Sequence, residues 1–358
     1  MQLHPDITVD WTVRPLSKFE HQGLHDVASV HDLIIYDHPF SGSIVQTAAF
    51  LPLSGLPGLR VDLSDADRYL GGSLLSYRIG GTVWGLPIDA ATQHAVYRAD
   101  LINGSAVPVS WTEALTLGKH LSRRGMRLGL AVQTPHAILT IAALMANLGH
   151  PWETAADAPF QIDKAAFIEA FDQIMALLQF CPQEAIGWNA IDLHEAMVAR
   201  DDIAYAPCVY GYGTYGEADQ RRRLSFGPFA GLRAPYHAGS VLGGTGLGIS
   251  RQTPHPQAAL AFLRFAASDA AQLVLTPQHH GQPAVAAAWS DPALDETFNG
   301  FFSAVAPSII AAWTRPRYAG YIAFQDKAGR IAAEALGQGG TATQVYAQIE
   351  PLFAAVNQ

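Results

Sequence analysis

A glycine-rich motif follows a predicted strand near the middle of the chain. Residues Gly211–Gly216 match the pattern G-x-G-x-x-G, whose glycines let a helix N-terminus approach the pyrophosphate of a dinucleotide. A polar run, Glu217–Arg223, follows in place of an apolar crossover helix. No acidic residue that would bind the ribose stands about 20 residues further on. We therefore reject a dinucleotide site and expect a flexible loop.

The same loop carries three tyrosines. Tyr210, Tyr212 and Tyr215 alternate with the glycines, and each offers a flat apolar ring with a polar tip. Because the loop follows a strand, we expect Tyr210 or Tyr212 to project into a ligand cleft. Tyrosine oxygens also suit ferric iron, and this remains the least favoured interpretation.

Two other groups of side chains have the chemistry of a binding site. Asp37 and His38 end a short apolar run, and ligands bind at strand ends in open α/β sheets. Neighbouring strand residues point to opposite faces, so this pair makes a poor catalytic dyad. Arg315 and Arg317 would face one side of an extended segment, where a guanidinium binds a carboxylate or phosphate. The alternative role for these arginines is a salt bridge between lobes.

Motifs for metals and nucleophiles are missing. His21 and His25 have helical spacing but no third ligand, and His279–His280 lies in a Gln/Pro/Gly loop. Neither a G-x-S-x-G elbow nor a Walker A loop occurs. We expect no cofactor, no metal and no catalytic residue.

Length and composition limit the possible protein classes. The 358 residues indicate about two domains, and 49% are hydrophobic while 15% are charged, against roughly 25% in average chains. The net charge of −9, with scattered basic residues, argues against nucleic-acid binding. Cys181 and Cys208 are the two cysteines, which excludes a disulfide scaffold and a four-thiolate zinc site but leaves one bond open.

Neither a membrane span nor a signal peptide is apparent. The longest apolar segment, His136–Gly149, is about 14 residues long, whereas a span needs about 20. The start Met1–Asp6 lacks a basic and an apolar region. The protein is therefore either cytosolic or begins after its targeting segment.

Strand-like and helix-like segments alternate throughout, which predicts an α/β fold. Ile7–Val13 predicts a strand, Pro15–Ser29 a helix and Asp32–Asp37 a buried strand, so we expect the two strands to pair in parallel. Ser110 and Glu113 fit a capping box that starts a helix. Further strands are expected at Met126–Val132, Ile203–Cys208 and Gly246–Ser250, and further helices at His136–Leu148, Lys164–Gln179, His194–Arg200, Pro256–Ala267, Glu296–Ala312, Gln325–Leu336 and Thr343–Val356.

Several short motifs occur in an order that resembles a known family. They are Asp37–Pro39, Ala49–Leu53, Gly81–Pro87, Gln93–Tyr97, Asp100–Leu101, Ser110–Leu115, Glu195–Ala199, Gly243–Gly246, Ala258–Ala267 and Gly281–Pro283. Together they resemble an extracellular solute-binding protein of the sugar-type ABC importers over nearly the whole chain. Family members normally begin with a further strand and helix ahead of the segment that matches Pro5–Trp11, which leaves the signal peptide and part of the site open.

The resemblance implies a two-lobed type II periplasmic-binding-protein fold with a ligand cleft between the lobes. Residues 1–98 with 239–290 would form lobe one, and residues 99–238 with 291–358 lobe two. The implied cleft residues are Asp37, His38, Trp84, Gln93, Tyr210, Tyr212, Gly244, Thr245, Gln282, Arg315, Arg317 and Tyr321. Aromatic rings would stack on the ligand while polar groups orient it.

The resemblance also implies the function and the partners. A periplasmic or extracellular monomer would capture a small polar solute, a sugar or a related and even acidic compound, by lobe closure. It would then pass the solute to an ABC permease and its ATPase without chemistry. The rival is a cytosolic enzyme on the same bilobal fold, motivated by Asp37, His38 and His280.

Overall fold

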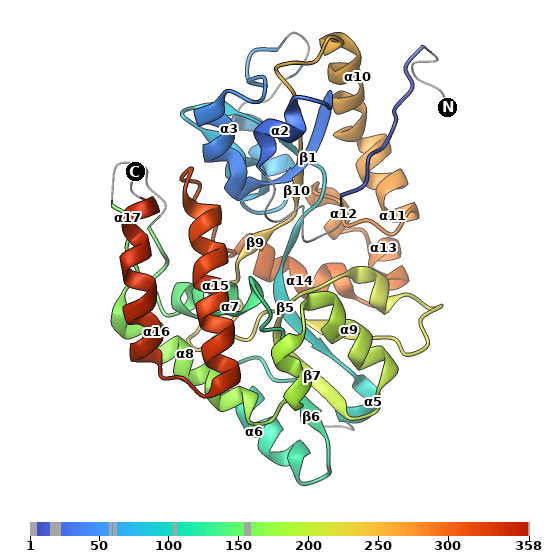
Figure 1. Ribbon diagram of the computed structural model, residues 1–358. Coiled ribbons are helices and arrows are strands. Elements are labelled where there is room, and N and C mark those ends of the chain that lie inside the picture. Colours follow the sequence, from blue (N-terminus) through green and yellow to red (C-terminus); the bar gives the residue numbers. More distant parts are fainter. Residues whose placement is uncertain are drawn as a thin grey trace.

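Two separate sheets form the centres of two lobes, one above the other in Figure 1. The structure is a computed structural model that describes residues 6–14, 23–56, 59, 63–102, 106–153 and 159–356. Most of the predicted helix Pro15–Ser29 lies outside the described residues, and its end forms α2 (Leu24–Ala28).

The sheet of the first lobe has three strands in the order β1 (Leu33–Asp37), β10 (Thr245–Ile249) and β4 (Leu86–Pro87). All pairs are antiparallel, and Asp37 lies opposite Thr245. Burial alternates along β1, so that Ile34 and Tyr36 face the core. The surrounding helices are α2, α3 (Ser41–Thr47), α4 (Ser73–Ser76), α10 (Pro256–Ala266), α11 (Thr276–Gln278) and α12 (Ala286–Trp289).

The expected strand Ile7–Val13 does not form, and the expected parallel pair is wrong. The chain is extended there without sheet pairing, and Trp11 meets the ring of Phe262 on α10 edge to face at 5.9 Å. Arg14 Nη2 donates to the carbonyl of Ile35 in β1 at 2.7 Å. The partner of β1 is β10, more than 200 residues later, which local sequence patterns do not reveal.

The sheet of the second lobe has the strand order β6 (Arg127–Leu128), β7 (Ile203–Tyr210), β5 (Ala91–Tyr97) and β8 (Ser225–Gly227). β7 runs parallel to β6 and antiparallel to β5. Seven consecutive residues of β7 are buried because helices cover both faces of the sheet.

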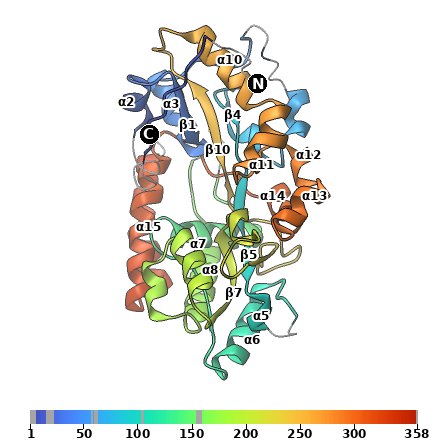
Figure 2. The ribbon, with the colours of Figure 1, turned by 90° about the vertical axis from the view of Figure 1, so that its right-hand side faces the viewer.

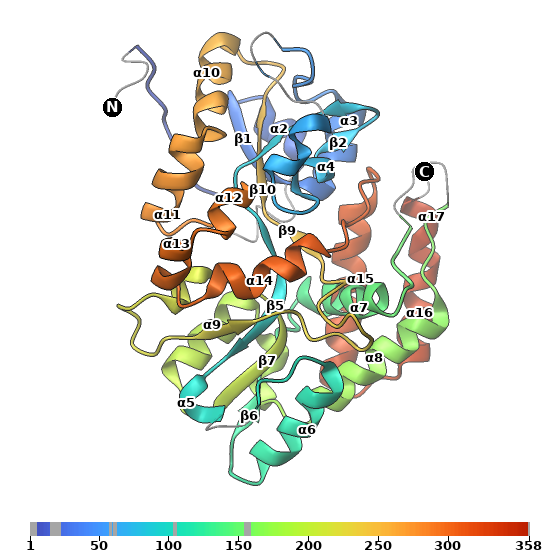
Figure 3. The ribbon, with the colours of Figure 1, turned by 180° about the vertical axis from the view of Figure 1, so that it is seen from behind.

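Helices cover the second sheet in two layers. One layer consists of α6 (Trp111–Ser122), α7 (His136–Asn147), α8 (Lys164–Leu178), α15 (Tyr321–Gln338), α16 (Ala342–Ile349) and α17 (Phe353–Val356). The other consists of α9 (Ala190–Ala199), α13 (Pro292–Thr297) and α14 (Phe301–Ile310). Figure 2 shows α15 and α14 on opposite sides of β5, and Figure 3, seen from behind, shows α14 crossing in front of β5.

Most helices begin and end near their predicted residues. Ser110 Oγ accepts from the Glu113 amide at 3.3 Å, as expected, but the Glu113 carboxylate accepts from Val109 instead of Ser110. The predicted helix Glu296–Ala312 is interrupted, because Asn299 and Gly300 adopt φ of 57° and 76° between α13 and α14.

The chain passes between the two sheets at two adjacent places. β4 leads into β5 through Asp89, and β9 (Leu242–Gly243) leads into β10 through Gly244. The two connections run side by side, since the amide of Ile88 donates to the carbonyl of Thr245 at 2.9 Å. These connections place polar side chains at the boundary between the lobes.

Within the described residues, no single helix has the length and apolar character needed to cross a membrane. The bent pair Pro256–Ala266 and Ala270–Gln278 passes that test jointly, with a 52° angle between its parts. Cys181 and Cys208 are both free and buried.

Candidate functional site

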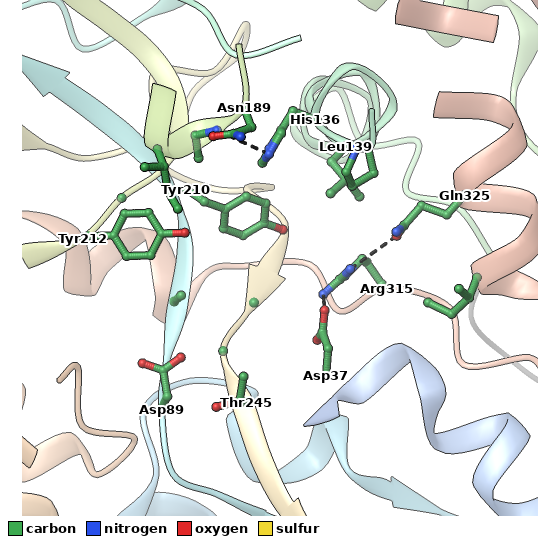
Figure 4. A pocket seen from close by; sticks show the side chains of 18 of the residues that line it. Asp37, Asp89, His136, Leu139, Asn189, Tyr210, Tyr212, Thr245, Arg315 and Gln325 are labelled. Carbon is green, nitrogen blue, oxygen red and sulfur yellow. Dashed lines mark hydrogen bonds and ion pairs between the residues drawn. The ribbon is translucent and has the colours of Figure 1, made fainter. Parts of the chain in front are cut away.

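A cavity of about 210 Å³ lies where the two connections meet the ends of α7, α9 and α15, and we call it the interlobe cavity. Figure 4 shows its side chains converging from both lobes. Its lining residues are Asp37, Phe40, Asp89, Ala91, Pro135, His136, Leu139, Asn189, Ala190, Ile191, Tyr210, Gly211, Tyr212, Gly243, Gly244, Thr245, Arg315, Ile322 and Gln325. The volume is below the about 300 Å³ at which pockets for drug-sized ligands begin, so it suits one small molecule.

Six of the twelve residues expected in the cleft line this cavity. They are Asp37, Tyr210, Tyr212, Gly244, Thr245 and Arg315. The other six are not among the lining residues; they are His38, Trp84, Gln93, Gln282, Arg317 and Tyr321.

Most residues of the second group hold the surrounding backbone in place. Gln282 Nε2 donates to the carbonyl of Ala90 at 3.2 Å, and its Oε1 accepts from the amide of Gly213 at 3.1 Å. Gln93 Oε1 accepts from the amide of Val241 at 3.2 Å. The side-chain amides of Gln93 and Gln282 therefore hold the connections between the lobes in place.

Arg317 points away from the cavity toward the end of α4. Its Nη1 donates to the carbonyls of Leu75, Ser76 and Arg78 at 3.0, 3.2 and 2.8 Å. Leu75 and Ser76 are the last residues of α4 and Arg78 lies two residues beyond it, so the cation lies where the last carbonyls of a helix need donors. Arg317 thus ties the segment before α15 to the first lobe.

The remaining three also make contacts outside the cavity lining. Tyr321 is buried at the start of α15, His38 is buried against the ring of Tyr77, and Trp84 Nε1 donates to the carbonyl of Ile79 at 3.4 Å. Within the described residues, the hydroxyl of Tyr321 has no hydrogen-bond partner.

A buried ion pair crosses one end of the cavity. Arg315 Nη2 donates to Asp37 Oδ2, and Arg315 Nη1 donates to Gln325 Oε1 at 3.3 Å (Figure 4). Burial disfavours the Asp37 carboxylate, but Arg315 and the neighbouring His38 outweigh this cost and lower the pKa of Asp37 to about 2. The charge of Arg315 is therefore already compensated by a protein carboxylate.

The tyrosine loop contributes two of its three rings to the cavity. Tyr210 packs over Gly243, where a Cβ would lie 2.8 Å from the ring, and its buried hydroxyl has no partner among the described residues. Tyr215 does not line the cavity, and its hydroxyl donates to Glu195 at 2.7 Å. Because the Tyr215 hydroxyl is bonded outside the cavity, the geometry gives no support to the ferric-ion interpretation, which needs all three tyrosines.

Asp89 is the most consequential residue that sequence reasoning missed. It lies in the first connection, and Gly244 passes so close that a Cβ there would lie 2.4 Å from the Asp89 carbonyl. Gly244 also has a φ of 94°, which favours glycine. Burial, together with the charge of Asp37, raises the pKa of Asp89 to about 7, although the amide of Thr245 opposes the shift.

The starts of two helices form the wall supplied by the second lobe. His136 begins α7 and Asn189 caps α9, where Asn189 Oδ1 accepts from the amide of Asp192 at 3.0 Å. The amide of Ala190 donates to His136 Nε2 at 3.4 Å. Sequence reasoning missed Asn189 and expected this helix to begin at His194; the Asn189 and Asp192 spacing is the capping signal that could have marked its start, but its place beside α7 depends on the tertiary fold.

The described residues contain no group of three or more histidine, cysteine, aspartate or glutamate side chains placed to hold a metal ion. His280, considered for an enzymatic role with Asp37 and His38, is not a lining residue. Its Nδ1 lies 2.8 Å from the Glu217 carboxylate.

Comparison with known proteins gives one family and many similar folds. Residues 21–292 match the model of a family described as bacterial extracellular solute-binding protein. A search of curated proteins gives no match.

Solved structures match over nearly the whole chain. The GacH receptor of Streptomyces glaucescens, solved unliganded and with acarbose, has a TM-score of 0.78 at 18% identity, covering 99% of this chain and 89% of its own. The sugar-binding protein MalE of Xanthomonas citri has a TM-score of 0.77 at 14% identity, with 99% and 90% covered. UgpB of Mycobacterium tuberculosis, solved with glycerophosphocholine, has a TM-score of 0.75 at 16% identity, with 93% and 86% covered.

Proposed function

Because this chain belongs to the family of bacterial extracellular solute-binding proteins, we propose that its interlobe cavity captures one small polar solute, a sugar or a related polyol, for delivery to a membrane importer. The family and the similar structures are binding proteins rather than enzymes, and family membership implies a location outside the cytoplasmic membrane. An ABC permease and its ATPase are the partners that complete this role.

The observation that carries the proposal is the mixture of rings and polar groups around the cavity. Tyr210 and Tyr212 supply flat apolar faces, while Asp89, Asn189 and Thr245 supply hydrogen-bonding groups. Sugars present this combination, because their C–H faces stack on aromatic rings and their hydroxyls bond in the ring plane. The sugar ligands of the similar MalE and GacH proteins agree with this class.

The charge of the cavity argues against a plain anion as the solute. Arg315 is the lining residue that would bind a carboxylate or phosphate, and Asp37 already occupies its guanidinium. A second anion would meet the Asp37 and Asp89 carboxyls as well. A neutral or cationic solute therefore fits better than an acidic one.

Mass spectrometry of the released solute tests the proposal. The full chain is purified without denaturation, then denatured, and the filtrate is analysed. A polyhydroxylated compound released at up to one per chain, which rebinds in calorimetry with 1:1 stoichiometry, is expected. If no solute is released and no sugar or polyol from a broad panel raises the melting temperature, the proposed function is wrong.

A further inference from the structure

One carboxyl group in the interlobe cavity has no cationic partner. Asp89 lines the cavity and, within the described residues, forms no ion pair with any lysine, arginine or histidine. It lies in the connection between β4 and β5, where Asp89 and Thr245 exchange backbone hydrogen bonds at 3.2 Å in both directions. The backbone of Asp89 is therefore fixed by the fold at the edge of the cavity.

The other charged groups of the cavity do not compensate Asp89. Arg315 is held by Asp37 and Gln325 at the other end, as Figure 4 shows. Burial lowers the pKa of His136 to about 4, so that its ring is neutral at pH 7. Asp37 adds repulsion to the cost of burying Asp89, which agrees with the raised pKa of that carboxyl. Asp89 is therefore only partly ionised at neutral pH when no cation lies beside it, and a cation bound there would favour its charged form.

The wall of the cavity opposite Asp89 carries a partial positive charge. α7 and α9, of 12 and 10 residues, both begin at the cavity with Pro135, His136, Asn189 and Ala190 among the lining residues. Helix N-termini carry a partial positive charge and favour oxygen acceptors. Between the walls, the buried hydroxyl of Tyr210 has no partner in the described part of the chain. The cavity is therefore asymmetric, with a carboxyl at one side and hydroxyl- or oxygen-binding groups at the other.

We propose that the captured solute is a hydroxylated amine, such as an amino sugar, whose protonated nitrogen binds the carboxylate of Asp89 while its oxygens face the starts of α7 and α9. This inference rests on the proposed function and narrows its solute class. A cationic nitrogen restores the charge balance that Asp89 lacks, and the faces of Tyr210 and Tyr212 favour a cation beside them. A neutral sugar would leave the carboxyl without a counter-ion.

The test compares matched probes and variants of the full chain. The probes are glucosamine, galactosamine and 6-amino-6-deoxyglucose at pH 6.5, against glucose, galactose and N-acetylglucosamine. Asp89→Asn keeps the size and removes the charge. Asp269→Asn is the control, since Asp269 is exposed, pairs with Arg68 outside the cavity and changes the net charge equally. Thermal melts and calorimetry report binding.

The expected result is that at least one amino sugar binds the wild-type protein and Asp269→Asn at least about tenfold more tightly than its neutral counterpart, and that Asp89→Asn removes this preference. A melting temperature of Asp89→Asn at or above wild type without added probe shows that the variant is folded. Equal binding of amine and neutral probes, or a released solute without a basic nitrogen, overturns this inference and leaves solute capture intact. If neither class binds and nothing is released, both proposals fail.

Discussion

The guanidinium of Arg315 binds the carboxylate of Asp37 across 278 residues of sequence, and their side chains are only 5% and 21% exposed. The pair joins the end of β1 in the first lobe to the segment that precedes α15. Because both groups are largely buried, each depends on the other for its charge to be tolerated.

Removing both members of this pair is expected to cost less than the sum of removing each one alone. Asp37→Asn or Arg315→Gln alone should lower the free energy of unfolding by about 3–5 kcal/mol, because one buried charge stays unpaired. The double variant should lose less than the sum of the two, with a coupling of about 0.5–3 kcal/mol. Urea unfolding of the four proteins measures this. Strictly additive losses would show that the two groups do not interact in solution.

Arg317 should act on stability and not on solute binding. Arg317→Ala removes three hydrogen bonds to carbonyls at the end of α4 and should lower the free energy of unfolding by about 1–3 kcal/mol. The released solute should bind the folded variant with unchanged affinity in calorimetry. A tenfold loss of affinity with unaltered unfolding would place Arg317 at the solute instead.

The ring of Tyr212 should contribute directly to binding. Tyr212→Ala should weaken binding of the released solute by about 1–3 kcal/mol, the scale of a lost stacking contact. Tyr215→Phe is the matched control, because Tyr215 belongs to the same loop, does not line the cavity and keeps its ring stacked on His194. Equal affinities of the two variants in calorimetry would remove Tyr212 from the solute contacts.

Gly244 should be far less replaceable than another glycine with a similar backbone. Gly244 and Gly339 both have positive φ, of 94° and 74°, but only Gly244 has backbone atoms where a Cβ would lie. Gly339→Ala should cost about 1 kcal/mol from backbone strain alone. Gly244→Ala should cost several times more, measured by chemical denaturation. Similar costs would mean that the two connections separate easily.

Stability should fall in mild acid. Burial lowers the pKa of His94 to about 3 and those of His38, His136 and His194 to about 4, although Asp37 partly opposes the shift of His38. Unfolded histidine titrates near 6.5, so between about pH 6.5 and 4 the unfolded chain binds more protons than the native one. The contribution of these histidines to the free energy of unfolding should therefore be fully present above pH 6.5 and should decrease steadily below it. Urea titrations from pH 7.5 to 4.5 measure the slope, and His194→Asn should reduce it. A flat profile would contradict native histidines that stay neutral.

Local sequence signals predicted many elements but not their long-range partners. The apolar run that ends at Asp37 identified β1, and Ser110 identified the start of α6. The strand partner of β1 and the orientation of that pair were mispredicted, because the true partner, β10, lies more than 200 residues later in the chain. Strand pairing over such separations depends on the whole fold.

The site was predictable where a motif marks it. The tyrosine loop and the glycines before β10 are visible in the sequence, and both reach the cavity. Asp89 follows an ordinary Leu-Pro-Ile segment, and His136 begins a helix whose apolar composition indicates only a core. Asp89 and His136 belong to the site only because the tertiary fold brings both to the same cavity, and no local sequence pattern indicates this.

The pairing of β1 with β10 also sets the order of events during synthesis. All strands from β5 to β8 lie between residues 91 and 227, so the second sheet can assemble before residue 245 leaves the ribosome. The first sheet must wait for β10, which leaves the apolar side chains of β1 without their neighbours for on the order of ten seconds at usual translation rates. The sheet that contains the earliest strand of the described residues is thus the later of the two to form, and the apolar face of β1 needs protection from aggregation throughout that interval.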